Sequence, residues 1–228
     1  MTQPDIILLH GAGGTRAELD PIAEAMGSDY RFWTLDMLGH GGRPTPSTYN
    51  IPEIADDLLA GLDAAGVGPA YYLGYSFGGY IALYIASRHP SRALGCCTLA
   101  TKFVFDQDTI NHALRIFDPA RAAALNIQPE QWVEAIHVKH RALLLGAITG
   151  GTPLVDNDLR ALVPPVLAMN GDGDPIVSAE ETRRTAALSP RYRSAIFEGR
   201  AHPMRILPHA LIATLVRDFI RDVESGAL

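Results

Sequence analysis

A serine stands between two glycines in the segment Gly74-Tyr75-Ser76-Phe77-Gly78-Gly79. The β-rich run Tyr71-Tyr72-Leu73 comes directly before it, and apolar residues at helical spacing follow it. A nucleophile at the tip of a sharp strand-to-helix turn needs a strained backbone, and glycines two positions before and after it relieve the crowding of the flanking chains. The pattern therefore predicts that Ser76 is a nucleophile lifted clear of a sheet edge.

A serine hydroxyl needs a base that takes its proton at neutral pH, and the base must itself be oriented. His202 is the candidate base, because it lies in a loop (residues 198–203) directly after the last expected strand. The carboxyl ends of parallel strands meet at one edge of a sheet, so this loop is expected beside Ser76. His209, which opens the last expected helix, is the alternative base.

The acid that orients the base is expected after a strand between Ser76 and His202. The segment Asn170-Gly171-Asp172-Gly173-Asp174-Pro175 follows such a strand and offers two carboxylates. Asp174 lies further along the loop, which favours it as the partner of a histidine on the next loop. Asp172 is the alternative, although an aspartate in that place shapes turns by accepting hydrogen bonds from nearby amides.

Acyl transfer also needs donors for the anionic oxygen of the tetrahedral intermediate, and backbone N–H groups are rigid and well aimed for this task. The amide of Phe77, at the start of the helix after the nucleophile, is one predicted donor. The second is the amide of Ala12, in the loop His10-Gly11-Ala12-Gly13-Gly14. Gly11 and Gly13 are predicted to line the substrate site, because glycine lets the backbone approach the substrate. The loop lacks the lysine and the spacing of a phosphate-binding motif, so no nucleotide is expected.

Short β-rich runs alternate along the chain with longer segments of helical spacing, which is typical of a parallel sheet with helices on both faces. Strands are expected at residues 6–9, 31–35, 71–74, 94–100, 165–169 and 194–197, and helices at residues 16–26, 52–65, 77–88 and 207–223. The predicted fold class is therefore α/β, with a mostly parallel, six-stranded sheet. No strand pattern occurs between about residues 103 and 151, where Pro129 and the residues after it predict one long helix.

The chain has 228 residues, of which 47% are hydrophobic and 19% charged, an ordinary balance for a globular protein. Its formal net charge of -6 and its scattered arginines argue against a nucleic-acid partner, which requires a clustered basic surplus. No apolar stretch approaches the ~20 residues that span a bilayer, and the first ten residues do not resemble a signal peptide. We therefore expect a cytoplasmic protein without a membrane partner.

Cysteine and histidine side chains are the groups that could ligate a metal or act as redox groups. The neighbouring Cys96 and Cys97 are expected to be reduced thiols inside a buried strand, because a bridge between adjacent residues is strained. His137 and His140 have helical spacing but no evident third ligand. The sequence therefore predicts neither a metal site nor a disulfide.

The motifs together resemble the α/β-hydrolase superfamily over essentially the whole chain outside the insertion. The landmarks come in the order of that superfamily: the His10-Gly11 loop, the turn at Asp36–Gly42, the elbow at Ser76, the acid loop and the histidine loop. The resemblance implies an α/β-hydrolase fold that lacks its usual first hairpin, because the chain starts at the strand before His10. A second departure is Arg200-Ala201, since glycine is common before the histidine.

The insertion stands where this superfamily carries its lid, and it predicts a small helical cap over the active site. The expected domain organisation is a hydrolase core formed by residues 1–102 and 152–228 and a cap formed by residues 103–151. Lys102 and Phe103, just past the fourth expected strand, are predicted to lie near the pocket and to bind substrate.

The resemblance and the residues together predict a serine hydrolase that cleaves a small ester or thioester through an acyl-enzyme. The triad is Ser76, His202 and Asp174, and this chemistry requires no cofactor or metal. Superfamily members with the same triad also act as lyases or carbon–carbon bond hydrolases, as in menaquinone biosynthesis, and some serve as ligand receptors. Both readings remain alternatives, because a fold does not determine a substrate. No oligomeric state is predicted.

Overall fold

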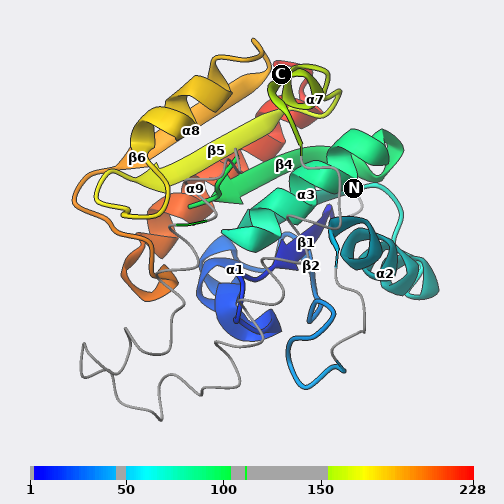
Figure 1. Cartoon of the computed structure of the whole chain (residues 1–228). Helices are drawn as coiled ribbons and strands as arrows, with labels where there is room; N and C mark the ends of the chain where they lie inside the picture. The colour runs from blue at the N-terminus through cyan, green and yellow to red at the C-terminus, as the bar shows by residue number, and fades with distance from the viewer. Residues whose placement is uncertain (1–2, 45–49, 104–110, 112–153) are drawn as a thin grey trace, which may run out of the picture.

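The computed structural model describes residues 3–44, 50–103, 111 and 154–228 (Figure 1). Its centre is a sheet of six strands in the order β2-β1-β3-β4-β5-β6. The strands are β1 (Asp5–Leu9), β2 (Arg31–Thr34), β3 (Ala70–Tyr75), β4 (Ala93–Leu99), β5 (Val166–Gly171) and β6 (Tyr192–Phe197). All neighbouring strands pair in parallel. The predicted α/β fold class is confirmed.

Helices cover both faces of this sheet (Figure 1). One face packs against α2 (Ile51–Ala64), α3 (Phe77–Arg88), α7 (Asp156–Arg160) and α8 (Ala179–Ala186), and the other against α1 (Asp20–Met26) and α9 (His209–Glu224). Successive strand residues alternate between the two layers, so that Tyr72 contacts the first and Tyr71 the second. Because both faces are covered, β3 is buried at every residue, which explains its continuous apolar run.

The two cysteines are neighbours in β4 and point to opposite faces of the sheet. Both are buried free thiols. Burial raises the pKa of Cys96 to about 12 and that of Cys97 well above its usual value. The thiolate is the reactive form of cysteine, so these residues serve as small packing side chains.

Local sequence explains where α2 begins. The side chain of Asn50 caps the helix by accepting the N–H of Glu53 at 2.9 Å, and Pro52 lies in the first turn, where its missing N–H costs nothing. The helix therefore begins at Ile51, one residue before the predicted start.

Two other predicted helices begin later than expected, in both cases at a proline. The first expected helix divides into a short 3-10 turn, η1 (Arg16–Leu19), and α1, which has Pro21 in its first turn. The last expected helix, residues 207–223, begins as α9 only at His209, after Pro208, and a separate 3-10 turn, η4 (Met204–Ile206), lies before the expected range. A proline inside a continuous helix removes one backbone hydrogen bond and clashes with the preceding turn, so the chain restarts the helix there.

Helix α8 was not predicted. Its sequence, AEETRRTA, is almost entirely polar, and its buried residues are threonines, Thr182 and Thr185. The available signal was the capping pattern at its start, where the Ser178 hydroxyl accepts the N–H of Glu181 at 3.1 Å.

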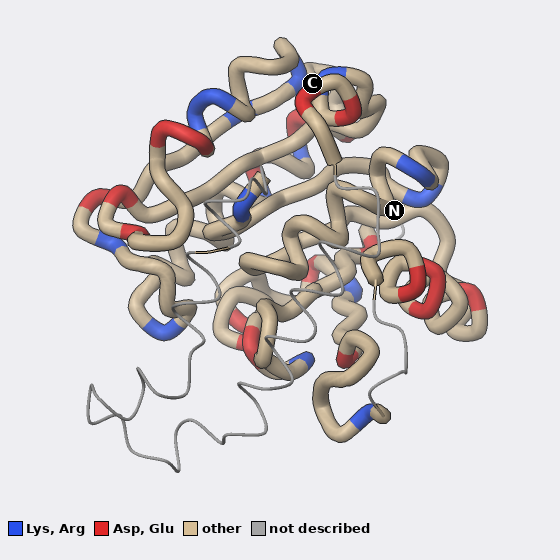
Figure 2. The backbone as a smooth tube through the Cα atoms, viewed as in Figure 1, with Lys and Arg blue, Asp and Glu red and all other residues tan. Residues whose placement is uncertain are grey.

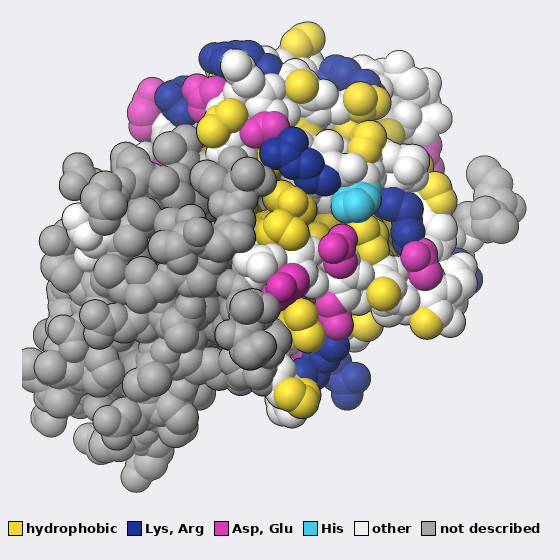
Figure 3. All heavy atoms as spheres, turned by 45° about the vertical axis from the view of Figure 1, so that its right-hand side comes forward, with side chains coloured by type: hydrophobic (Ala, Val, Ile, Leu, Met, Phe, Trp, Pro, Cys, Tyr) yellow, Lys and Arg dark blue, Asp and Glu magenta, His cyan; other side chains and the backbone are white. Residues whose placement is uncertain are grey.

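The predicted cap, residues 103–151, falls almost entirely outside the residues that the structure describes, and so does the long helix expected after Pro129. Within the described ranges, no helix is both long and apolar enough to cross a membrane. Acidic and basic side chains are interspersed along the chain in Figure 2 and on the face seen in Figure 3. The charged residues, which are scattered along the sequence, are therefore also scattered on these parts of the surface.

Parallel strands place the segments that follow them at one edge of the sheet. The loops after β1, β3, β5 and β6 therefore meet there, and they carry Ala12, Ser76, Asp174 and His202 respectively. Open parallel sheets bind ligands at this edge.

The packing of α3 on β1 generates a stability prediction. A Cβ on Gly78 would lie 2.2 Å from the carbonyl oxygen of Leu9, and backbone cannot easily move aside. We expect Gly78→Ala to lower the free energy of unfolding by about 1–3 kcal/mol through overpacking. Gly61→Ala on α2 is the matched control, since a Cβ there meets only Leu35 at 4.0 Å.

The control should be neutral or stabilising by about 0.5–1 kcal/mol, because alanine is the better helix former. Urea unfolding of the three proteins measures both changes. Equal midpoints for wild type and Gly78→Ala contradict the proposed close approach.

Candidate active site

Ser76 occupies a strained turn between β3 and α3. Its φ of 50° and ψ of -114° place a non-glycine residue in a region that side chains rarely adopt. The Ser76 N–H donates to the carbonyl of Leu99 at 2.8 Å, which fixes the turn to the end of β4. A Cβ on Gly74 would lie 2.4 Å from the carbonyl group of Gly78, so the chains on either side of the serine touch. Both flanking glycines are needed for this geometry.

His202 joins Ser76 to Asp174. Its Nε2 lies 3.1 Å from the Ser76 Oγ, and its Nδ1 lies 2.7 Å from Oδ2 of Asp174. A carboxylate only accepts hydrogen bonds, so Nδ1 carries the proton and Nε2 is left to accept the serine hydroxyl. The tautomer is therefore the one that a general base needs.

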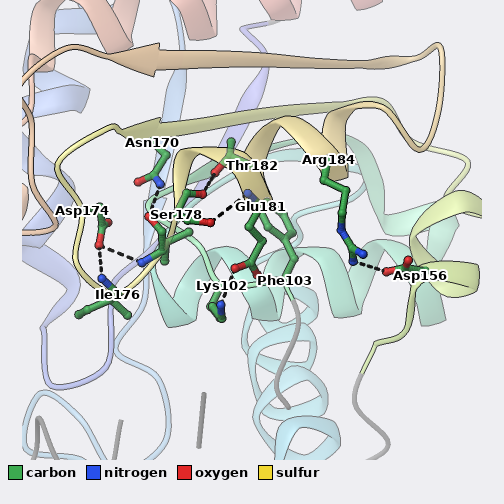
Figure 4. A network of polar contacts seen from close by, with 11 residues as sticks. Lys102, Phe103, Asp156, Asn170, Asp174, Ile176, Ser178, Glu181, Thr182 and Arg184 are labelled. Carbon is green, nitrogen blue, oxygen red and sulfur yellow. Dashed lines mark hydrogen bonds and ion pairs between the residues drawn. The ribbon is translucent and has the colours of Figure 1, made fainter. Parts of the chain in front are cut away.

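The second oxygen of the Asp174 carboxylate is held by backbone. Oδ1 accepts the N–H groups of Ile176 at 2.8 Å (Figure 4) and Val177 at 3.0 Å. The side chain is fully buried. These donors compensate for the burial of the charge. The carboxylate is thereby aimed at His202 from a rigid loop.

Asp172 has a different partner. Its Oδ1 accepts the N–H of Gly199 at 2.7 Å, in the loop that carries the histidine. The N–H of Gly173 donates to the carbonyl of Arg200 at 2.9 Å, and a Cβ on Gly171 would lie 2.0 Å from that oxygen. Asp172 therefore joins the acid loop to the histidine loop, and the structure places Asp174 alone of the two on His202.

The alternative base, His209, is engaged elsewhere. Its Nε2 lies 2.8 Å from the carbonyl oxygen of Met204, at the start of η4. This contact fixes the turn between the histidine loop and α9. Among the described residues, the ring that reaches Ser76 is therefore that of His202.

The loop after β1 is braced by His10. The His10 Nδ1 lies 2.8 Å from the carbonyl of Gly11, and its Nε2 accepts the N–H of Met37 at 3.0 Å. Burial lowers the pKa of His10, which favours the neutral ring that this pair of contacts requires. The Gly14 N–H also donates to the Gly11 carbonyl at 3.0 Å, and Gly13 has a φ of 82° in this turn. Several contacts thus hold one peptide group in place.

The two predicted oxyanion donors lie on neighbouring segments. Phe77 is the first residue of α3, where a backbone N–H has no partner within its own helix. Ala12 is half-buried against the core, Gly11 is buried, and Gly13 is exposed. Because Gly78 packs on the end of β1, the start of α3 and this loop are adjacent. Their roles at an oxyanion or a substrate stay predictions.

Lys102 and Phe103, the predicted substrate contacts, lie against α8 (Figure 4). The Lys102 ammonium pairs with the Glu181 carboxylate at 2.5 Å, and the Phe103 N–H donates to the same carboxylate at 2.9 Å. Phe103 is buried in the core. These contacts anchor the chain at the start of the predicted cap, and binding of substrate by either residue stays a prediction.

Sequence reasoning missed Tyr75, although it stands inside the elbow motif. Its hydroxyl donates to the carbonyl of His202 at 2.9 Å, and the two rings lie 5.4 Å apart. A Cβ on Gly11 would lie 2.8 Å from the Tyr75 ring. Burial raises the pKa of Tyr75 far above its usual value, so the hydroxyl stays a donor. Tyr75 thus lies between the histidine loop and the loop after β1.

In the part of the chain that the structure covers, no group of three or more histidine, cysteine, aspartate or glutamate side chains could hold a metal ion. His137 and His140 lie outside the described residues. The arrangement at Ser76 can activate a hydroxyl as a nucleophile without such a group.

A family model described as "alpha/beta hydrolase fold" matches residues 4–157. The chain belongs to the α/β-hydrolase family. A pimeloyl-[acyl-carrier protein] methyl ester esterase of Neisseria meningitidis serogroup B is 33% identical over 105 residues, 45% of this chain and 39% of that protein. A protein of the same name from Sodalis glossinidius is 25% identical over 227 residues, 87% of this chain and 86% of its own.

The fold is also found in solved α/β-hydrolase structures. A thermophilic esterase from Thermogutta terrifontis superposes with a TM-score of 0.80 at 21% identity, covering 97% of this chain and 91% of the esterase. At this identity the likeness concerns the fold. This family membership, predicted from the motif order, is therefore confirmed.

The different partners of the two aspartates generate a paired prediction. Asp174→Asn should slow the labelling of Ser76 by a fluorophosphonate by about 10²–10⁴-fold, because an amide opposite Nδ1 favours the wrong tautomer. Asp172→Asn should change the rate less than about threefold, since its amide oxygen can still accept the Gly199 N–H. Second-order labelling rates measure both. A larger loss in Asp172→Asn than in Asp174→Asn contradicts the assignment.

Proposed function

We propose that this protein is a serine esterase that hydrolyses a small carboxylic ester or thioester through an acyl-enzyme. The observation that carries the proposal is the continuous hydrogen-bonded chain from Ser76 through His202 to Asp174. The strained backbone of Ser76 supports it, because strain of this kind is typical of a nucleophile on a strand-to-helix turn. The names of its relatives support ester cleavage as the reaction.

In the first half of the reaction, the Ser76 oxygen attacks the substrate carbonyl carbon while His202 takes the hydroxyl proton. The carbonyl oxygen becomes an oxyanion, which the amides of Ala12 and Phe77 bind. The intermediate then collapses. The bond to the alcohol or thiol breaks, the leaving group receives the proton from His202, and the acyl group stays on Ser76.

In the second half, a water molecule replaces the leaving group. His202 takes a proton from the water as it attacks the acyl carbon, and the same amides bind the second oxyanion. Collapse returns that proton to the Ser76 oxygen and releases the acid. Asp174 stabilises the imidazolium in both halves and keeps its charge throughout. Every proton in the cycle is moved by one imidazole.

The experiment compares wild type with Ser76→Ala on p-nitrophenyl esters of increasing acyl length. Ser76→Ala should lower kcat by a factor on the order of 10⁶, to near background, because the nucleophile is removed. Ser28→Ala, at an exposed serine remote from the triad, is the matched control and should keep full activity. Mass spectrometry of quenched wild type should find one acyl group on the peptide that contains Ser76.

Three results contradict the proposal. The first is a wild-type protein that neither hydrolyses any ester nor reacts with a fluorophosphonate. The second is turnover of a vinylogous diketone or a cyclohexadiene acid without ester cleavage, which assigns carbon–carbon bond hydrolysis or lyase chemistry to the same triad. The third is tight ligand binding that survives Ser76→Ala, without turnover, which assigns a receptor instead.

A further inference from the structure

Glu18 lies on η1, next to the loop that carries Ala12. Its Oε2 accepts the N–H of Gly11 at 2.8 Å. The proposed function assigns no task to this carboxylate. Its charge interacts with that of His202, the ring that Asp174 binds from the acid loop.

The contact with Gly11 bears on the direction of the Ala12 amide. The Gly11 carbonyl and the Ala12 N–H belong to one planar peptide group and point in opposite directions. His10 and Gly14 bind that carbonyl, and Glu18 binds the N–H on the other side of the Gly11 Cα. Only the φ and ψ of Gly11 join these two peptide groups, and glycine resists rotation less than other residues. The hydrogen bond between the Gly11 N–H and Glu18 therefore restricts the remaining rotation about the φ and ψ of Gly11.

The Glu18 carboxylate packs closely against the backbone of the loop after β1. A Cβ on Gly14 would lie 2.2 Å from the Glu18 Oε2, and one on Gly11 would lie 3.5 Å from the same atom. The carboxylate occupies the volume that a side chain at residue 14 would take. The absence of a side chain there and the position of Glu18 are therefore linked.

Glu18 also shares a cavity with the base. The cavity has a volume of about 510 Å³ and is lined by residues that include Glu18, Tyr75, His202, Arg205 and His209. Burial raises the pKa of Glu18, while the Gly11 N–H and the charge of His202 lower it. A carboxylate in this place favours the imidazolium that exists while His202 holds the serine proton.

We propose that Glu18 is a positioning residue for the reaction at Ser76: its carboxylate aims the Ala12 amide at the oxyanion and stabilises the imidazolium of His202. The inference rests on the proposed esterase function. Glu18 touches no reacting atom and acts through Gly11 and His202.

Other charged and titratable groups face His202 from the surrounding elements. Asp174 binds Nδ1, the Tyr75 hydroxyl binds the backbone carbonyl, and Arg205 and His209 line the same cavity. These groups are unchanged in a Glu18 variant, so a change in the pH profile reports Glu18.

The test uses two substitutions with different consequences. Glu18→Ala removes both the acceptor and the charge. It should lower kcat for a p-nitrophenyl ester by about 10- to 100-fold, less than the ~10²–10³-fold cost of losing a donor outright, with KM changed less than about threefold. Glu18→Gln keeps an oxygen that can accept the Gly11 N–H, so its kcat near pH 8 should stay within about threefold of wild type.

The two substitutions share one effect on pH dependence. Without the carboxylate the imidazolium loses a stabilising charge, so the acidic limb of kcat/KM should move to lower pH. The measured quantity is the ratio of kcat/KM at pH ~5.5 to kcat/KM at pH 8. This ratio should be about two- to fivefold higher in Glu18→Gln than in wild type, because a partly screened charge interaction has an energy of this size. Glu24→Gln, at an exposed glutamate on α1, is the matched control and should follow the wild-type profile.

Gly14→Ala tests the position of the Glu18 carboxylate without changing Glu18 itself. The new methyl group should displace the flexible end of Glu18 and leave the backbone in place, because the φ of Gly14 is not in the left-handed region. It should lower kcat to about the level of Glu18→Ala. The double variant should lose little more than either single variant, because both remove one interaction.

The outcomes separate this inference from the proposed function. If wild type turns over esters, Ser76→Ala does not, and both Glu18 variants match wild type in kcat and pH profile, the inference fails and the esterase stands. The inference also fails if the pH profile of kcat/KM for Glu18→Gln is the same as the profiles of wild type and Glu24→Gln. If wild type turns over no ester, the proposed function fails and the inference fails with it.

Discussion

The close approach between the start of α3 and the end of β1 is the constraint on which the rest of the site depends. Gly78 lies so near the carbonyls of Leu9 and His10 that no side chain fits between them. This contact brings the helix that begins after Ser76 against the loop that follows β1. The amides of Ala12 and Phe77, the predicted oxyanion donors, thus lie on adjacent segments that are far apart in the sequence.

Main-chain contacts also position the acid and the base. The loops after β5 and β6 are joined through Asp172, Gly173 and the Arg200 carbonyl, so the acid and the histidine are carried by one interlocked unit. Asp174 then needs only to orient its carboxylate, which two backbone N–H groups do. Neighbouring aspartates in one short loop thus have different tasks. One holds the two loops together, and the other holds the imidazole.

The histidines show how environment divides similar side chains by function. His10 is buried, and desolvation favours its neutral form, in which it braces the loop after β1. His202 sits between a carboxylate and a hydroxyl, where it can exchange a proton. Glu18 connects the two regions, since it contacts the braced loop and lies in the cavity beside the base. A site assembled this way relies on preorganised backbone more than on many charged groups.

The sequence by itself determined the six strands, the helices α1, α2, α3 and α9, the elbow at Ser76 and the family. Apolar periodicity, proline positions and glycine spacing are local properties, and they act within a few residues. Helix α8 escaped prediction because its buried face is made of threonines. The partners of Asp172 and Asp174, the Glu18 contact with Gly11 and the Lys102 pair with Glu181 were decided only by the tertiary structure. Each depends on how loops from different strands pack at one sheet edge, and no local pattern records the distance between side chains that the fold brings together.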